Sequence, residues 1–217
     1  MDTEGKTSEL KTTIEEEILL GRLFPRERLV EDELMERFNA KRHIVRSTLD
    51  QLASEGMVEK RKNVGALVRS YSEKDVVELY ELRDLLETSA VGKINFPVST
   101  EELASLEQAQ QKHDNAIEAR NVLAVIRANA EFHDKIFALQ DNVTLSKAIE
   151  RYSGMTYVIR SAAFSSQSSL RRSQTEHHAM IEAIKNADHK KLVDICRQHL
   201  LPSRDAYLER LHISGQR

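Results

Sequence analysis

Four side chains in the C-terminal part of the chain have the types and spacing of a metal site. Asn129 and His133 are four residues apart in "ANAEFHDKIF", so in a helix both lie on one face, one turn apart. His177 or its neighbour His178 precedes the turn "NADH" by about nine residues, and His199 follows that turn by about eleven. At a rise of ~1.5 Å per residue, an antiparallel helix pair brings two such imidazoles to nearly the same height. Imidazole suits Zn, Ni, Cu or Fe, so the pattern predicts a site of three histidines and one amide oxygen.

The simpler interpretation is that each histidine is a hydrogen-bonded core residue, the more common role of a single histidine on an apolar helix face. Spacing alone does not decide between His177 and His178. The amide of Asn129 brings no charge to offset a cation, so we expect weaker binding than a carboxylate would give. The other histidines of this half are predicted to lie on the surface: His113, His189 and His212.

The residues after position 70 form the helices that would carry these side chains. The predicted helices cover residues 73–94, 100–118, 121–140, 144–165, 170–187 and 188–212, and Ser72 is the predicted N-cap of the first. Breaks fall at "NFPVST", "EARN", "QDNVT", "SSQSS" and "NADH". Since no strand-like alternation interrupts them, we predict an antiparallel bundle of about six helices.

The first 70 residues follow a different pattern. Three helices are predicted at residues 8–20, 31–38 and 42–56, and two β-prone runs then flank "KNVG", which indicates a hairpin. Three helices followed by a hairpin is the order of a winged helix-turn-helix, in which the third helix enters the major groove of DNA. The sequence is therefore mainly α, with predicted domains at 1–70 (DNA binding) and 71–217 (a helical bundle with the metal-site candidates).

The distribution of charge agrees with a DNA-binding first domain. Residues 1–36 carry 5 basic and 11 acidic side chains, whereas residues 37–69 carry 8 basic and 3 acidic ones. This short positive block covers the third helix and the hairpin, where phosphates would lie. There are two alternatives to DNA binding: the positive block is a solvated face, or the winged helix is used for protein contacts.

Composition narrows the class of protein. The chain has 217 residues, 40% of them hydrophobic, with only 3 prolines and 7 glycines, which argues against an all-β fold. No apolar run approaches the ~18 residues of a membrane span, and the N-terminal "MDTEGKTSELKTT" has no signal-peptide core. A single cysteine, Cys196, fits a reducing cytoplasm, which is the expected location.

Several short motifs occur together in a characteristic order. In the first half they are "GRLFP" (21–25), "VRSTL" (45–49), "LASEGMV" (52–58) and "VGALV" (64–68). In the second half they are "YELRDLLE" (80–87), "NAEFH" (129–133), "EHHAMIEAI" (176–184) and the "HL" at 199–200. Read together, they resemble the GntR family of bacterial transcription regulators, in the FadR-type branch with an all-helical ligand-binding FCD domain.

The resemblance implies roles for residues of the first domain. Arg42 and Arg46 would contact DNA from the recognition helix, through phosphate or a guanine edge. His43 and Ser47 also lie off the core face of that helix and could contact DNA. Gly65 would be the wing-tip glycine, where a side chain would obstruct the approach of the backbone to DNA.

The resemblance also implies the metal ligands. Asn129, His133, His177 and His199 fall on the family's four ligand positions, which selects His177 over His178. The expected cofactor is a divalent transition metal, Zn or Ni. Asn129 stands where the family commonly has aspartate, and this departure leaves open whether metal binds tightly, weakly or not at all.

Two arginines are the expected effector-binding residues. Arg83 resembles an arginine that points into the family's effector cavity, where it could pair with a carboxylate. Its alternative is a surface salt bridge with Glu87, four residues later. Arg160 is the second candidate. In the recognition helix Lys41 replaces the family's capping serine, so the family's operator sequence does not transfer.

The function predicted from these features is ligand-responsive transcription regulation. The resemblance to the family favours repression over activation. A homodimer would bind operator DNA, and a small organic acid would bind the bundle, with the metal holding the acid. One alternative is a metal-dependent enzyme with an accessory DNA-binding head. Another is a metal-free bundle that senses an uncharged ligand.

Overall fold

The protein, described here from a computed structural model, forms two compact units. The described residues are 3–62, 65–164 and 166–215. The first unit comprises the chain up to Tyr71 together with Gly154–Ser161, and the second comprises Ser72–Ser153 and Ala162–Arg217. The division after Tyr71 lies one residue beyond the predicted boundary, whereas the grouping of 154–161 with the first unit was not predicted. Within the described stretches, no helix is both long and apolar enough to cross a membrane.

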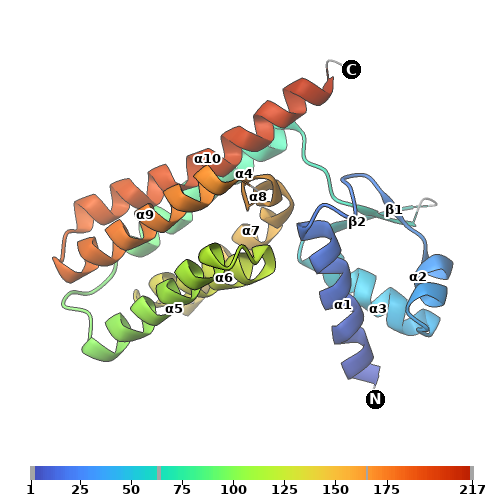
Figure 1. Ribbon diagram of the computed structural model, residues 1–217, viewed down its shortest axis with the longest axis horizontal. Coiled ribbons are helices and arrows are strands. Elements are labelled where there is room, and N and C mark those ends of the chain that lie inside the picture. The colour runs from blue at the N-terminus through green and yellow to red at the C-terminus, as the bar shows by residue number, and fades with distance from the viewer. Residues whose placement is uncertain (1–2, 63–64, 165, 216–217) are drawn as a thin grey trace. The chain divides into compact units, whose positions relative to one another are not determined.

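The first unit contains three helices of the N-terminal region and a small antiparallel sheet (Figure 1). Its elements are α1 Thr3–Leu19, β1 Arg28–Leu29, α2 Glu31–Arg37, α3 Arg42–Ser54, β2 Val58–Arg61 and β3 Gly65–Val68. The strands lie in the order β1-β3-β2, with Arg28 opposite Leu67. The predicted winged helix-turn-helix is confirmed. Strand β1 was not predicted because it has only two residues.

Burial of one face fixes the orientation of α3. Its buried apolar residues are Ile44, Val45, Leu49 and Leu52, and the helix packs on α1, whose Ile14 is fully buried. Each such side chain contributes roughly 1.5–3 kcal/mol when removed from water, so rotation of α3 about its axis would be costly. The opposite face is therefore held towards solvent. Lys41, at the N-cap of α3, makes no side-chain capping hydrogen bond.

After Tyr71, the described residues form seven helices. They are α4 Glu73–Val91, α5 Thr100–Glu118, α6 Val122–Ala138, α7 Val143–Met155, α8 Tyr157–Phe164, α9 Gln167–Lys185 and α10 His189–Gly215. The helix predicted at 144–165 is two helices, because the chain turns at Thr156. Ser72 caps α4 as predicted, in a capping box with Asp75.

The helices of the second unit form a bundle. Helix α5 packs on α6 and α9, and α10 packs on α4 and α9, as the ribbon shows (Figure 1). The core between them contains Phe132 of α6, Met180 of α9 and Leu192 of α10, all buried. The apolar faces of α6, α9 and α10 thus meet, and this packing brings the candidate histidines of those helices together.

Candidate metal centre and nucleic-acid interface

Three histidines from three helices meet inside the bundle. His133 on α6, His177 on α9 and His199 on α10 each offer a ligand atom, and these atoms all lie within 4.8 Å of one another. The ring centroids are 4.9–5.0 Å apart in every pair. His133 Nε2 is 3.2 Å from His199 Nε2. The spacing argument from the sequence predicted that His133 and His199 would meet either His177 or His178, and the cluster contains His177.

The neighbouring helix positions hold two of these rings in place. The ring of Phe132, fully buried, stacks on His177 with centroids 4.1 Å apart. The ring of Phe137 stacks on His133, 5.8 Å away. Asn129, one helical turn before His133 on α6, is buried as well. Aromatic packing of this kind limits ring rotation, so the imidazoles are preorganised.

A carboxylate sets the orientation of His199. Its Nδ1 donates a hydrogen bond to Glu176 Oε2 at 2.7 Å, and Glu176 Oε1 accepts another from Arg172 Nε at 2.6 Å. Burial opposes ionisation of Glu176, but the hydrogen bonds from His199 and Arg172 outweigh it and lower the pKa of this carboxyl group. With its proton on Nδ1, His199 presents the lone pair of Nε2 to the cluster.

An amide performs the same task for His177. Its Nδ1 lies 2.8 Å from Gln110 Oε1 and donates to that oxygen, while Gln110 Nε2 donates to Asp114 Oδ1 at 2.6 Å. His177 therefore also presents Nε2 to the cluster. The adjacent His178 takes a different direction, since its Nε2 contacts Asp114 Oδ2 at 2.9 Å and its side chain is 55% exposed. His177, not His178, belongs to the cluster.

The arrangement of ring nitrogens fits a bound cation. Nδ1 of His177 and of His199 is directed at Gln110 and at Glu176, so the Nε2 atoms of both rings face the cluster. There His133 Nε2 and His199 Nε2 lie within hydrogen-bonding distance, and a metal ion bound between the rings would replace the proton that they share. Protonation is disfavoured at His177, since burial and the neighbouring histidines lower its pKa well below 6.5. Two nitrogens bound to one tetrahedral zinc lie about 3.3 Å apart, close to the 3.2 Å separation of His133 and His199.

His113 corrects one expectation from the sequence. It was predicted on the surface, but it is fully buried on α5, and its ring centroid is 4.9 Å from that of His177. Within the described residues its Nε2 has no hydrogen-bond partner. Burial lowers the pKa of His113 to about 4. Its helical spacing from the buried Leu106 and Ala109 would have revealed the buried position.

Arg83 is also more enclosed than expected. It does pair with Glu87, Nε to Oε1 at 2.7 Å, but the two residues are only 5% and 2% exposed, so this is a buried ion pair and not a surface one. Burial opposes the charge on Arg83, but the attraction of Glu87 outweighs it and raises the pKa of the arginine. The guanidinium carbon of Arg160, on α8, lies over the ring of Tyr157, 4.7 Å from the ring centroid. The effector-binding roles of Arg83 and Arg160 stay predictions.

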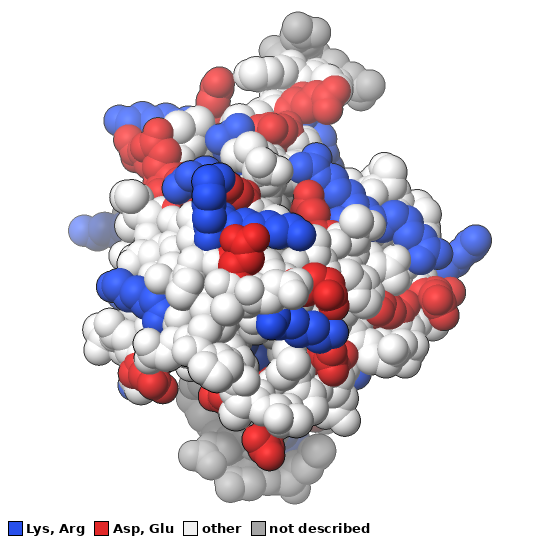
Figure 2. Space-filling model, turned by 90° about the vertical axis from the view of Figure 1, so that its left-hand side faces the viewer, with Lys and Arg blue, Asp and Glu red and all other residues white. Residues whose placement is uncertain are grey.

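The exposed face of α3 carries the four residues expected to contact DNA. Arg42, His43, Arg46 and Ser47 are all exposed, opposite the buried face of the helix. Gly65 begins β3 with a φ of +98°, a backbone conformation that favours glycine. The adjacent residues 63 and 64 of the predicted hairpin turn lie outside the described residues. Elsewhere, on the face shown in Figure 2, the described Lys and Arg side chains are interspersed with Asp and Glu.

Two family matches together cover most of the chain. The gntR family of bacterial regulatory proteins matches residues 6–68, and the FCD domain matches residues 78–201. The chain belongs to the GntR family and carries an FCD domain. This GntR/FCD protein is accordingly a DNA-binding transcriptional regulator.

Sequence relatives of this GntR/FCD regulator match most of its length, and solved structures share its fold. It is 26% identical over 185 residues to the HTH-type transcriptional regulator YdhC of Bacillus subtilis, covering 85% of this chain and 81% of YdhC. It is 29% identical over 153 residues to the Nta operon transcriptional regulator of Aminobacter aminovorans, covering 70% and 71%. Among solved structures, E. coli McbR/YncC has a TM-score of 0.78 at 19% identity, covering 95% of this chain and 98% of that one. At that identity the likeness establishes the fold.

Proposed function

We propose that this GntR/FCD regulator is a cytoplasmic, homodimeric repressor that binds a transition metal and senses a small organic acid at that metal. The observation that carries the proposal is the convergence of His133, His177 and His199, with ligand atoms within 4.8 Å of one another. Asn129 would add an amide oxygen. Zn or Ni suits this donor set best.

The protein's own residues prepare this site for a cation. Gln110 and Glu176 accept the Nδ1 protons of His177 and His199, which leaves the inward nitrogens free to bind. With only neutral imidazole and amide donors, a bound divalent ion keeps its positive charge, and that charge would attract a carboxylate. The metal would supply coordination positions for the acid.

A binding role accounts for these contacts better than a catalytic one. A metal-dependent hydrolase needs a general base beside the activated water. Glu176, a carboxylate in direct contact with the histidine cluster, has both oxygens engaged, by His199 and by Arg172. We therefore propose that the chain is not an enzyme.

The DNA-binding half of the proposal rests on the exposed face of α3. Arg42, His43, Arg46 and Ser47 would contact operator DNA, and Gly65 would allow the wing to approach the backbone. In a homodimer two such helices would occupy successive major grooves of a near-palindromic site. Repression agrees with one relative, 27% identical over 184 residues, named the probable D-xylose utilization operon transcriptional repressor of Paenarthrobacter nicotinovorans.

Elemental analysis of the purified protein tests the metal site. We expect about one equivalent of Zn or Ni in the wild type and a large loss in His133→Ala. His212→Ala is the matched control, because His212 is an exposed histidine of α10, and we expect it to keep its metal. Equal metal contents in the wild type and His133→Ala would refute the site.

Gel retardation tests the response to an effector. The probe is a duplex from the DNA beside the protein's own gene, with citrate, other carboxylic acids or neutral sugars added to the metal-loaded protein. Because coupling between two sites is reciprocal, an acid that weakens DNA binding must bind the DNA complex less tightly than the free protein. A response to neutral sugars alone, unchanged in His133→Ala, would favour a metal-free sensor instead.

A further inference from the structure

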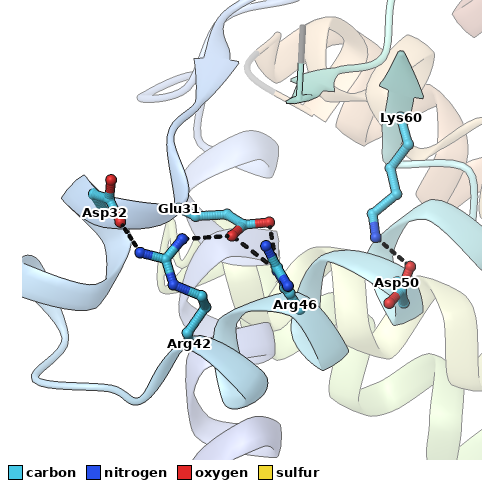
Figure 3. Close-up of polar contacts among 6 residues, drawn as sticks. All are labelled: Glu31, Asp32, Arg42, Arg46, Asp50 and Lys60. Atoms are coloured by element: carbon cyan, nitrogen blue, oxygen red, sulfur yellow. Dashed lines mark hydrogen bonds and ion pairs between the residues drawn. The ribbon is translucent and has the colours of Figure 1, made fainter. Parts of the chain in front are cut away.

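Two exposed arginines of the recognition helix are held by one acidic residue of the preceding helix. Glu31 begins α2, and its Oε1 and Oε2 both accept from Arg46 Nε, at 3.1 and 2.9 Å. The same Glu31 Oε2 accepts from Arg42 Nη1 at 3.3 Å, and Asp32 Oδ1 accepts from Arg42 Nη2 at 2.6 Å (Figure 3). Glu31 thus bridges the two arginines across the helix-turn-helix.

The two arginines are held in different ways. Arg42 uses both of its Nη groups, one on Glu31 and one on Asp32, so its outer end is occupied by carboxylates. Arg46 is held only through Nε, and within the described residues its two Nη groups have no hydrogen-bond partner. The Arg46 side chain is 57% exposed. Its outer end is therefore available to a ligand while its inner edge is fixed.

This arrangement matches a specific mode of base recognition. An arginine reads guanine through two parallel N–H groups directed at O6 and N7, which requires a defined guanidinium plane. Ion pairs between exposed groups contribute little to protein stability, so the contact is not needed to hold the fold. A carboxylate on Nε fixes the plane of Arg46 before DNA arrives and so reduces the ordering that binding requires.

We propose that Glu31 is a positioning residue that determines sequence specificity, by orienting Arg46 to read a guanine in the major groove. Arg42, by contrast, exchanges Glu31 and Asp32 for a DNA phosphate and contributes affinity without base preference. This inference rests on the proposed assignment of α3 as the DNA-reading helix.

The test compares Glu31→Gln with Glu33→Gln. Glu33 is exposed on the same helix and has no ion pair with either arginine, so both variants lose one negative charge from α2. The wild type first selects its preferred duplex from a random pool. Fluorescence anisotropy then gives the dissociation constants for the selected duplex and for a scrambled one, at one fixed salt concentration, since salt alone changes both.

We expect Glu31→Gln to lower the ratio of the affinity for the selected duplex to the affinity for the scrambled duplex by about 10-fold. The reason is that glutamine has only one side-chain oxygen that can accept from Arg46 Nε. Glu33→Gln keeps the ratio. Arg46→Ala lowers it similarly, and adding Glu31→Gln to Arg46→Ala lowers it no further. Selection repeated with Glu31→Gln should relax the preference for guanine at one base pair of each half-site and leave the other positions unchanged.

Two results would overturn the inference, and they are distinguishable. Equal ratios for Glu31→Gln and Glu33→Gln, in variants with the wild-type circular dichroism spectrum and melting temperature, would show that Glu31 acts only as a charge. If the wild type selects no duplex, or Arg46→Ala keeps the full ratio, the assignment of α3 as the reading helix fails, and the role of Glu31 fails with it.

Discussion

Substitution of Glu176 tests the metal centre without removing a proposed ligand. Its Oε2 accepts a 2.7 Å hydrogen bond from His199 Nδ1, and the two side chains are 18% and 14% exposed, so water replaces this contact poorly. Hydrogen-bond partners of metal-binding histidines are typically worth about 10- to 100-fold in metal affinity. That range corresponds to about 1.4–2.7 kcal/mol.

The two replacements of Glu176 should differ. Glu176→Gln loses the charge, but its amide oxygen can still accept from His199, as Gln110 already does from His177, so we expect a loss near 10-fold. Glu176→Ala loses the acceptor as well, so we expect a loss near 100-fold. Competition for Zn²⁺ between the protein and a chromophoric chelator at fixed pH measures both.

The control is Glu182→Gln, on the same helix. Glu182 is exposed and pairs with Lys185, away from the histidines, so this variant should bind zinc as the wild type does. If both Glu176 variants bound zinc as tightly as Glu182→Gln, the reasoning that Glu176 orients His199 towards an ion would be refuted.

Three further predictions concern stability, measured by urea unfolding with a chelator present. Burial lowers the pKa of His113 to about 4 in the folded protein. The unfolded chain therefore binds a proton at this histidine more tightly than the folded protein does. As the pH falls from 7 to 5, we expect the free energy of unfolding to decrease by about 2 kcal/mol for this reason. His113→Gln should remove that part of the pH dependence, and an unchanged slope would contradict the assignment. Glu87→Ala, which leaves buried Arg83 without its carboxylate, should cost about 3–5 kcal/mol, and Glu87→Leu with Arg83→Met should cost much less. Ser72→Ala removes the N-cap of α4 and should lower stability by about 1 kcal/mol.

Local periodicity explains why much of the site could be predicted. Asn129 and His133 share a face because they are one turn apart on one helix. His177 and His199 meet because α9 and α10 are joined by a short turn, so their heights follow from counting residues. The family pattern then selected His177, and the contact of His178 with Asp114 provides a physical reason for that choice.

Contacts between elements distant in sequence could not be predicted in this way. Gln110 reaches His177 from α5, and Glu31 reaches Arg46 from α2, so each pair depends on how two helices pack. The two-residue strand β1 forms only because β3 provides its partner. The turn at Thr156 has no proline, and Gly154 before it is a single glycine of the kind that a helix tolerates, so a single helix was predicted there.

The most direct test of the central claim is a zinc K-edge X-ray absorption spectrum of the zinc-loaded protein. The account predicts a first shell with about three imidazole nitrogens at ~2.0–2.1 Å and outer-shell scattering from their rings. In His133→Ala the imidazole contribution should decrease. A spectrum with an oxygen shell alone, identical in the wild type and His133→Ala, would contradict the claim that these three histidines bind one metal ion.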